Sequence, residues 1–232
     1  MKICSFNIKN NYNEYDVNKS LTIIKFIKEN DIDILCTQEL FDKCHYDISK
    51  YLKNSNYKIY GKYRFKLMLL RKINESMGII TNQNVICNKT YKLPFFPSTL
   101  KRIMTKIIIN TDEFGEICVM NTHLDYKFNF VRKRQLNKLL KIIKKEKRPL
   151  ILTGDFNTKI KTPLFINFIE ELKNININRV ELNEKTLKQS RSHFAIDHIF
   201  LSDNFKINKK EVIKSLGISD HYPLLISIKK KN

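Results

Sequence analysis

Polar residues of the kinds that bind metal ions and transfer protons recur where short apolar runs of this sequence end. The run Pro149–Thr153 is followed by Gly154-Asp155-Phe156-Asn157, and the run Tyr222–Ile228 is preceded by Ser219-Asp220-His221. A buried strand fixes the backbone at such a point while the adjoining loop frees the side chain, so ligand sites of α/β sheets form there. We expect the strand to stop at Gly154, where glycine lets the backbone turn tightly.

Two further apolar runs carry residues of the same kinds. Asn7 lies within the first run, Lys2–Ile8, and Gln38-Glu39 ends the run Ile32–Thr37. A side-chain amide in a buried strand needs hydrogen-bond partners. We therefore expect Asn7 to lie beside the carboxylate of Glu39.

Strand-like and helix-like segments alternate along the chain. The clearest helix, 130–145, has an apolar stripe of Val131, Leu136, Leu139, Leu140 and Ile143 opposite a basic outer face. Other helices are expected at 19–30, 45–54 and 163–172, and strands at 2–8, 32–37, 57–60, 66–70, 77–81, 85–93, 103–110, 116–122, 149–153, 195–201 and 222–228. The alternation predicts one α/β domain, residues 1–232, with two sheets between helices.

The formal net charge of +20 has two compatible explanations. Lys and Arg contacts to phosphates supply affinity for a polyanion, which favours a nucleic-acid partner. Lys, Asn and Ile dominate the composition, as the codon usage of an AT-rich genome would also produce. Charge alone does not distinguish DNA, RNA or an anionic membrane surface.

The five cysteines favour a reducing compartment. Cys4, Cys36 and Cys118 lie in apolar strand-like runs, where small thiols fill cores. The first residues lack the apolar centre of a signal peptide, and there is no apolar run of the ~18 residues that a membrane span needs. We expect a cytoplasmic monomer without membrane insertion.

These motifs together resemble those of the endonuclease/exonuclease/phosphatase superfamily, the DNase-I-like metallophosphoesterases. Each motif is weak alone, but the ordered set covers nearly the whole chain: Asn7, Gln38-Glu39, Asn121-Thr122-His123-Leu124, Gly154-Asp155-Phe156-Asn157, Asp197 and Ser219-Asp220-His221. The resemblance implies a four-layer α-β-β-α sandwich of two mixed sheets flanked by helices. It places the active site at one edge of the paired sheets.

The resemblance also implies a metal site. Phosphodiester cleavage needs a cation to offset the charge of the phosphoryl oxygens, and a hard cation such as Mg²⁺ prefers carboxylate oxygens. Glu39 matches the metal-binding glutamate of the superfamily, with Asn7 beside it and Asp220 as a carboxylate on the metal side. The expected cofactor is Mg²⁺, with Mn²⁺ as a substitute.

By the same resemblance, four residues carry the chemistry. Asp155 would orient or activate the attacking water, and Asn157 would bind the phosphate. His221 would be the catalytic histidine, and Asp197 would pair with it and fix its tautomer. The sequence leaves open whether His221 acts as a general base or as an imidazolium that stabilises the transition state.

Four further residues are expected to support the site. His123 matches a histidine that donates to a phosphate oxygen, and Glu75 matches a glutamate that supports it. Arg102 and Asn121 are expected on the substrate side, Asn121 through the turn that it shares with His123.

The substrate is less constrained. Lys9 stands where abasic-site endonucleases usually have an acidic residue, and Phe6 stands where tyrosyl-DNA phosphodiesterases have Trp. The segment Pro94-Phe95-Phe96-Pro97, which lies in the loop 91–101 beside lysines, has two interpretations. Its rings could stack on bases or wedge into a groove, or they could pack beneath a rim loop.

We expect a Mg²⁺-dependent phosphodiesterase that cleaves nucleic acid, with DNA favoured over RNA. The alternative is a phosphatase or phosphodiesterase acting on a small or lipid phosphate, such as an inositol phosphate or sphingomyelin. A catalytically inactive binding module is disfavoured because the set of catalytic residues is complete.

Overall fold

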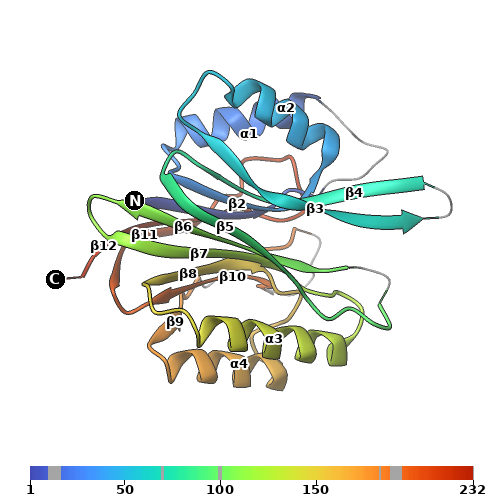
Figure 1. Ribbon diagram of the computed structural model, residues 1–232, viewed down its shortest axis with the longest axis vertical. Coiled ribbons are helices and arrows are strands. Elements are labelled where there is room, and N and C mark those ends of the chain that lie inside the picture. Colours follow the sequence, from blue (N-terminus) through green and yellow to red (C-terminus); the bar gives the residue numbers. More distant parts are fainter. Residues whose placement is uncertain (10–16, 69–70, 99–100, 183, 189–194, 232) are drawn as a thin grey trace.

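Two mixed six-stranded sheets lie face to face between two layers of helices in the computed structural model of this protein (Figure 1). It describes residues 1–9, 17–68, 71–98, 101–182, 184–188 and 195–231, without the side chains of 41–43 and 62–76. The elements are β1 (Lys2–Asn7), α1 (Val17–Glu29), β2 (Ile34–Phe41), α2 (Asp42–Leu52), β3 (Lys58–Met68), β4 (Arg71–Thr81), β5 (Asn84–Lys92), β6 (Ile103–Thr111), β7 (Gly115–His123), α3 (Asn129–Ile143), β8 (Leu150–Asp155), α4 (Pro163–Lys173), β9 (Ile177–Arg179), β10 (Asp197–Ser202), β11 (Phe205–Val212) and β12 (Leu224–Lys230).

Each sheet is built around one parallel pair of strands. The first has the order β11-β12-β1-β2-β4-β3, and the second has the order β5-β6-β7-β8-β10-β9. β1 pairs in parallel with β2, and β7 with β8, whereas β12 and β10 run antiparallel to β1 and β8. The carboxyl ends of β1, β2, β7 and β8 therefore lie where β10 and β12 begin.

Three apolar layers hold the sandwich together. Between the sheets, Ile3 and Ile34 share one cluster with Ile107 and Ile199 of the opposite sheet. α1 and α2 cover the outer face of the first sheet, and α3 and α4 cover that of the second (Figure 1). This confirms the predicted four-layer sandwich. Among the helices that the structure describes, none is long and apolar enough to cross a membrane.

The buried face of α3 is less apolar than its sequence predicts. Leu140 is only partly buried, whereas the polar residues Arg132 and Gln135 are buried. Their hydrogen bonds go to the loops at the amino end of the helix, so α3 organises those loops as well as the core.

Two predicted strand ends lie in the wrong place. β8 does not stop at Gly154 but continues through it to Asp155, because Gly154 pairs with Thr122 of β7 and His198 of β10. β2 likewise continues beyond Gln38-Glu39 to Phe41 through a break in its register with β4. The candidate residues therefore lie inside strands, where the sheet holds them.

The sequence also misjudged the strands that contribute least to the core. The runs 57–60 and 66–70 belong to a longer hairpin of β3 and β4, although 69–70 fall outside the described residues. β9 and β11 were not predicted. β11 is mostly exposed and has three lysines, Lys206, Lys209 and Lys210, so it has no alternating apolar pattern to read.

A buried ion pair beyond the carboxyl end of α3 predicts acid-sensitive stability. The Glu146 side chain is 4% exposed, binds Lys106, and accepts a 3.0 Å bond from Arg148 Nη1. Burial opposes its charge, but these partners outweigh burial and lower the pKa of Glu146 to about 2. Because an unfolded glutamate has a pKa of about 4.3, this stabilisation is complete above that pH and is lost as pH falls through about 2.

We therefore expect Glu146→Gln to lower the free energy of unfolding near pH 6 by about 1.5–3 kcal/mol, the range for hydrogen bonds to charged groups. Urea denaturation at several pH values would measure this difference, which should shrink from about pH 4.3 downward. Glu171→Gln is the control, because the Glu171–Lys144 pair is about half exposed. A difference that stays constant down to pH 2 would contradict the prediction.

Candidate functional site

Six strand ends bring six polar side chains to one edge of the sandwich. Asn7 and Asp155 end β1 and β8, His123 ends β7, and Glu39 lies near the end of β2. Asp197 begins β10, and His221 precedes β12. Because the neighbouring strands run antiparallel, residues that begin them meet residues that end the parallel strands.

The carboxylate of Asp155 lies at the centre of this group. Its Oδ2 accepts a 3.0 Å hydrogen bond from Asn7 Nδ2 and lies 3.4 Å from His123 Nε2. Its Oδ1 accepts a 2.8 Å bond from the backbone N–H of Asn157. The next residue, Phe156, points to the opposite face and packs on Phe165 of α4, which anchors the strand end.

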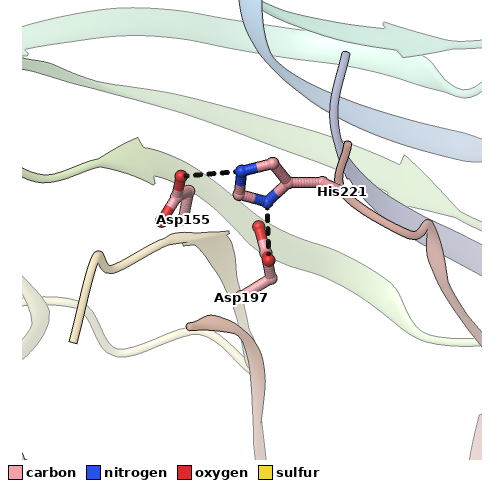
Figure 2. Close-up of side chains that lie close together, drawn as sticks. All are labelled: Asp155, Asp197 and His221. Atoms are coloured by element: carbon pink, nitrogen blue, oxygen red, sulfur yellow. Dashed lines mark hydrogen bonds and ion pairs between the residues drawn. The ribbon is translucent and has the colours of Figure 1, made fainter. Parts of the chain in front are cut away.

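His221 lies between two aspartates (Figure 2). Its Nδ1 is 2.9 Å from Asp197 Oδ2, and its Nε2 is 3.9 Å from Asp155 Oδ2. Burial disfavours a charged ring, but the Asp197 carboxylate outweighs burial and raises the pKa of His221. Asp197 therefore favours the imidazolium form of the ring, whose Nε2 is turned toward Asp155.

Burial has the opposite effect on Asp155. It raises the pKa of this carboxyl, the neighbouring Asp197 raises it further, and His221, Asn157 and Asn7 oppose the rise. Ligand atoms of Asp155, Asp197 and His221 lie within 4.8 Å of one another and could surround a cation. Because Asp197 binds Nδ1, the ring atom that His221 turns toward Asp155 is Nε2.

Arg102 fixes the orientation of His123. Arg102 Nη1 lies 2.8 Å from His123 Nδ1. Because a guanidinium can only donate, Nδ1 must be the acceptor and the ring hydrogen lies on Nε2, which faces Asp155 and Glu39. Arg102 is 3% exposed, so it acts through His123 and does not reach outward to a substrate. Glu75 lies in β4 opposite Phe41, and its side chain is outside the described residues.

Glu39 fits the role of a hard-cation ligand. It has a positive φ of 55° at the register break of β2, an uncommon conformation for a residue other than glycine. Its side chain is 29% exposed, and its Oε1 accepts a 3.2 Å bond from Asn7 Nδ2. Two carboxylates, those of Glu39 and Asp155, thus share one amide donor, and a cation would relieve their repulsion.

Asn7 and Asp220 both contact Lys9, and Asp220 Oδ1 is buried without a hydrogen-bond partner among the described residues. Asn7 Oδ1 accepts the backbone N–H of Lys9, so its amide orients the two carboxylates. Asp220 Oδ2 forms a 2.8 Å ion pair with Lys9 Nζ. The lysine thus compensates the charge of Asp220.

Two of the predicted substrate contacts are occupied within the protein. Asn121 is fully buried, receives a bond from Gln38 Nε2 and donates to the carbonyls of Thr37 and Gly78. Its position does not fit a substrate contact, because its amide joins the two sheets. The Nδ2 of Asn157 donates to the carbonyl of Leu124 at 3.0 Å and so holds the loop that follows His123.

The structure adds supporting residues that the sequence did not reveal. Ser219 Oγ donates to the carbonyl of Asn7 and accepts the backbone N–H of His221. Thr186 Oγ1 accepts the backbone N–H of Asp197. Ser219 belongs to the Ser219-Asp220-His221 motif, but its bond to Asn7 spans 212 residues, and no motif marks Thr186.

Known proteins share this architecture. The profile described as the Endonuclease/Exonuclease/phosphatase family matches residues 4–221. No curated protein matches the sequence.

Three solved structures illustrate the similarity. An endonuclease/exonuclease/phosphatase from Beutenbergia cavernae has a TM-score of 0.83 at 14% identity, covering 100% of this chain and 72% of that one. ANGEL2, a 2',3'-cyclic phosphatase in complex with adenosine-2',3'-vanadate, has a TM-score of 0.77 at 20% identity, with 100% and 96% covered. The mannosyl-6-phosphatase of Bacteroides thetaiotaomicron has a TM-score of 0.76 at 19% identity, with 98% and 99% covered. These likenesses show the shared fold.

Proposed function

Because this chain belongs to the endonuclease/exonuclease/phosphatase family of metal-dependent phosphoric ester hydrolases, we propose that it is a Mg²⁺-dependent phosphodiesterase that cleaves nucleic acid, with DNA favoured over RNA. The observation that carries the proposal is the position of Asp155 between His123 and His221 and beside Glu39. The net charge of +20 favours a polyanionic substrate.

Glu39 is the residue that would hold the cation, with Asp155 beside it and Asn7 orienting both. When bound, Mg²⁺ supplies positive charge to the phosphoryl oxygens. The buried carboxylate of Asp155 accepts a hydrogen bond from the attacking water and aligns it. Hydrogen bonds from Asn7 and Asn157 keep this carboxylate in place for the task.

The two histidines donate to the phosphoryl group in different ways. His221 is an imidazolium whose Nε2–H stabilises the charge that develops in the transition state, and Asp197 maintains its charge. His123 is neutral and donates Nε2–H to a phosphate oxygen, because Arg102 occupies Nδ1. Of the two roles open for His221, we therefore assign that of the charged donor.

Metal-dependent cleavage of end-labelled single-stranded, duplex and abasic DNA and of RNA, with Mg²⁺ or EDTA, tests the proposal. Cutting that is lost in His221→Ala and in Asp155→Asn supports a nuclease, and the product ladder separates endonuclease from exonuclease action. If a folded protein cuts no nucleic acid, the alternative is a phosphatase on a small or lipid phosphate. The mannosyl-6-phosphatase among the similar structures favours that alternative.

Removing the charge of Glu39 is expected to weaken the metal site. Glu39→Gln keeps the shape of the side chain but replaces a charged ligand oxygen with a neutral one, and we expect Mg²⁺ affinity to fall by about tenfold or more. Isothermal titration calorimetry with Mg²⁺ measures this directly. Glu29→Gln, on the exposed end of α1, is the matched control. If the two variants bind Mg²⁺ with equal affinity, Glu39 is not a ligand of the metal ion.

We place the protein in the cytoplasm, as a monomer. Cys4, Cys36, Cys44 and Cys118 are free thiols buried in the apolar layers. Buried free thiols agree with a reducing compartment.

A further inference from the structure

Exposed aromatic side chains of the described chain fall into two groups. Tyr46 and Tyr51 lie on α2, in the helix layer of the first sheet. The other four lie on two segments at the amino end of α3, with exposed fractions of 74% for Phe96, 62% for Tyr126, 52% for Phe130 and 38% for Phe95. We call these four the aromatic platform. Their exposure differs from the packing beneath a rim loop that the sequence left open.

Hydrogen bonds from α3 join the two segments into one surface. Gln135 Nε2 donates to the carbonyl of Pro94 at 2.8 Å, and its Oε1 accepts the backbone N–H of Asp125 at 2.8 Å. Arg134 Nη1 donates to the carbonyl of Phe96 at 3.3 Å. In Figure 1 the loop after β5 passes beside the first turn of α3. The platform is therefore held in position by a buried side chain.

Both segments of the platform lead directly to residues of the candidate active site. Tyr126 follows His123 by three residues, and the intervening Leu124 donates its backbone N–H to the carbonyl of Asp155 at 2.9 Å. The other segment leads to Arg102, which binds His123. A polymer whose phosphate lies beside Asp155 would place its neighbouring units over the platform.

Cations lie among and beyond the rings. Lys101 Nζ is 6.0 Å from the centre of the Phe95 ring, and Lys127 Nζ is 5.1 Å from that of Phe128. A row of cations then continues along the outer face of α3 for about 10 Å at 1.5 Å per residue. Its members are Arg134, Lys138 and Lys141, and Lys145 follows beyond the end of the helix. A row of that length exceeds the reach of one small phosphate and suits a chain of phosphates.

Building on the proposed function, we propose that the aromatic platform binds a single-stranded nucleic acid by stacking on its bases, while the cations of α3 contact its phosphates. Bases of a single strand present their faces for stacking, whereas those of a duplex are already stacked on one another. The substrate class is therefore single-stranded or unpaired nucleic acid next to the scissile phosphate.

Fluorescence anisotropy of a labelled oligothymidylate of about twelve nucleotides tests the platform, in a His221→Ala background so that the strand is not cut. Phe96→Ala with Tyr126→Ala should weaken binding by at least about tenfold, because base stacking is worth about 1–3 kcal/mol per base. Tyr46→Ala with Tyr51→Ala removes two exposed rings from the opposite helix layer and should leave binding unchanged. Unlabelled duplex should compete more weakly than unlabelled single strand.

Three results would overturn the inference. One is equal binding by the platform variant and the control variant. Another is stronger competition by duplex than by single strand. The third is a platform-dependent affinity for phosphatidylglycerol vesicles but not for the oligonucleotide, which would make the platform a membrane contact.

The same substitutions in the enzyme that retains His221 separate this inference from the proposed function. If the parent cuts nucleic acid and the platform variant binds and cuts it equally well, only the platform is refuted. If the parent cuts no nucleic acid, the proposed function itself fails.

Discussion

Replacing His221 with alanine is expected to lower kcat for phosphodiester cleavage by about 10²–10³-fold, the usual cost of removing one hydrogen-bond donor that stabilises charge in the transition state. The loss follows from the geometry, because the ring is the group that Asp197 holds, at 2.9 Å, facing Asp155. Single-turnover cleavage of end-labelled DNA in saturating Mg²⁺ would measure it. His45→Ala is the control, since His45 lies on α2, which covers the outer face of the first sheet and contributes none of the described residues of the site.

Because Asp197 acts through His221, we expect the losses caused by replacing the two residues not to add. Asp197→Asn alone should lower kcat, because the imidazolium loses the carboxylate that maintains its charge. Combined with His221→Ala, it should cost little more, because residues that act as a unit are not additive. Circular dichroism must show that all three variants are folded. Multiplied losses in the double variant would mean that Asp197 has a separate role.

Replacing Gly154 with alanine is expected to lower the free energy of unfolding by about 4 kcal/mol or more, a size that points to a specific clash. A Cβ on Gly154 would lie 2.0 Å from the carbonyl oxygen of Thr122, which is backbone and cannot rotate away. The φ of Gly154 is +150°, a backbone conformation that residues other than glycine rarely adopt. Strands β7 and β8 would have to separate beside the site.

Gly115→Ala separates the clash from the backbone conformation. Gly115 has a φ of +69°, but nothing lies within 4 Å of its added Cβ. It should therefore lose only about 1–2 kcal/mol, the cost of a left-handed backbone. Urea denaturation of both variants gives the comparison. If Gly154→Ala is no less stable than Gly115→Ala, the close approach of β7 and β8 is refuted.

The sequence predicted most of the fold because its patterns are local. Apolar runs such as 2–8 and 149–153 and the helical stripe of 130–145 alternate in the order that the sandwich requires. The strands that it missed, β9 and β11, and the strand β3 that it divided into two runs, lie at the edges of the sheets. β11 buries few side chains and β9 has only three residues, so no apolar period identifies them.

For the candidate site, the sequence determined which residues come to the strand ends, because a strand end and its polar neighbour are adjacent in the chain. It did not determine which of them meet. Asn7 and Asp155, which form a hydrogen bond, are 148 residues apart. Asn121 links the two sheets and does not fit the expected substrate contact, because it binds Gln38, 83 residues away.

Only the tertiary structure decided those contacts, since they depend on how two sheets stack. It placed Lys9 against Asp220, Arg102 behind His123, and Gln135 between the two segments of the platform. No periodic pattern and no fixed spacing in the sequence links these side chains to their partners. Their roles follow from packing and hydrogen bonding across the sandwich, whereas the chain itself supplied the strands, the helices and the chemistry at their ends.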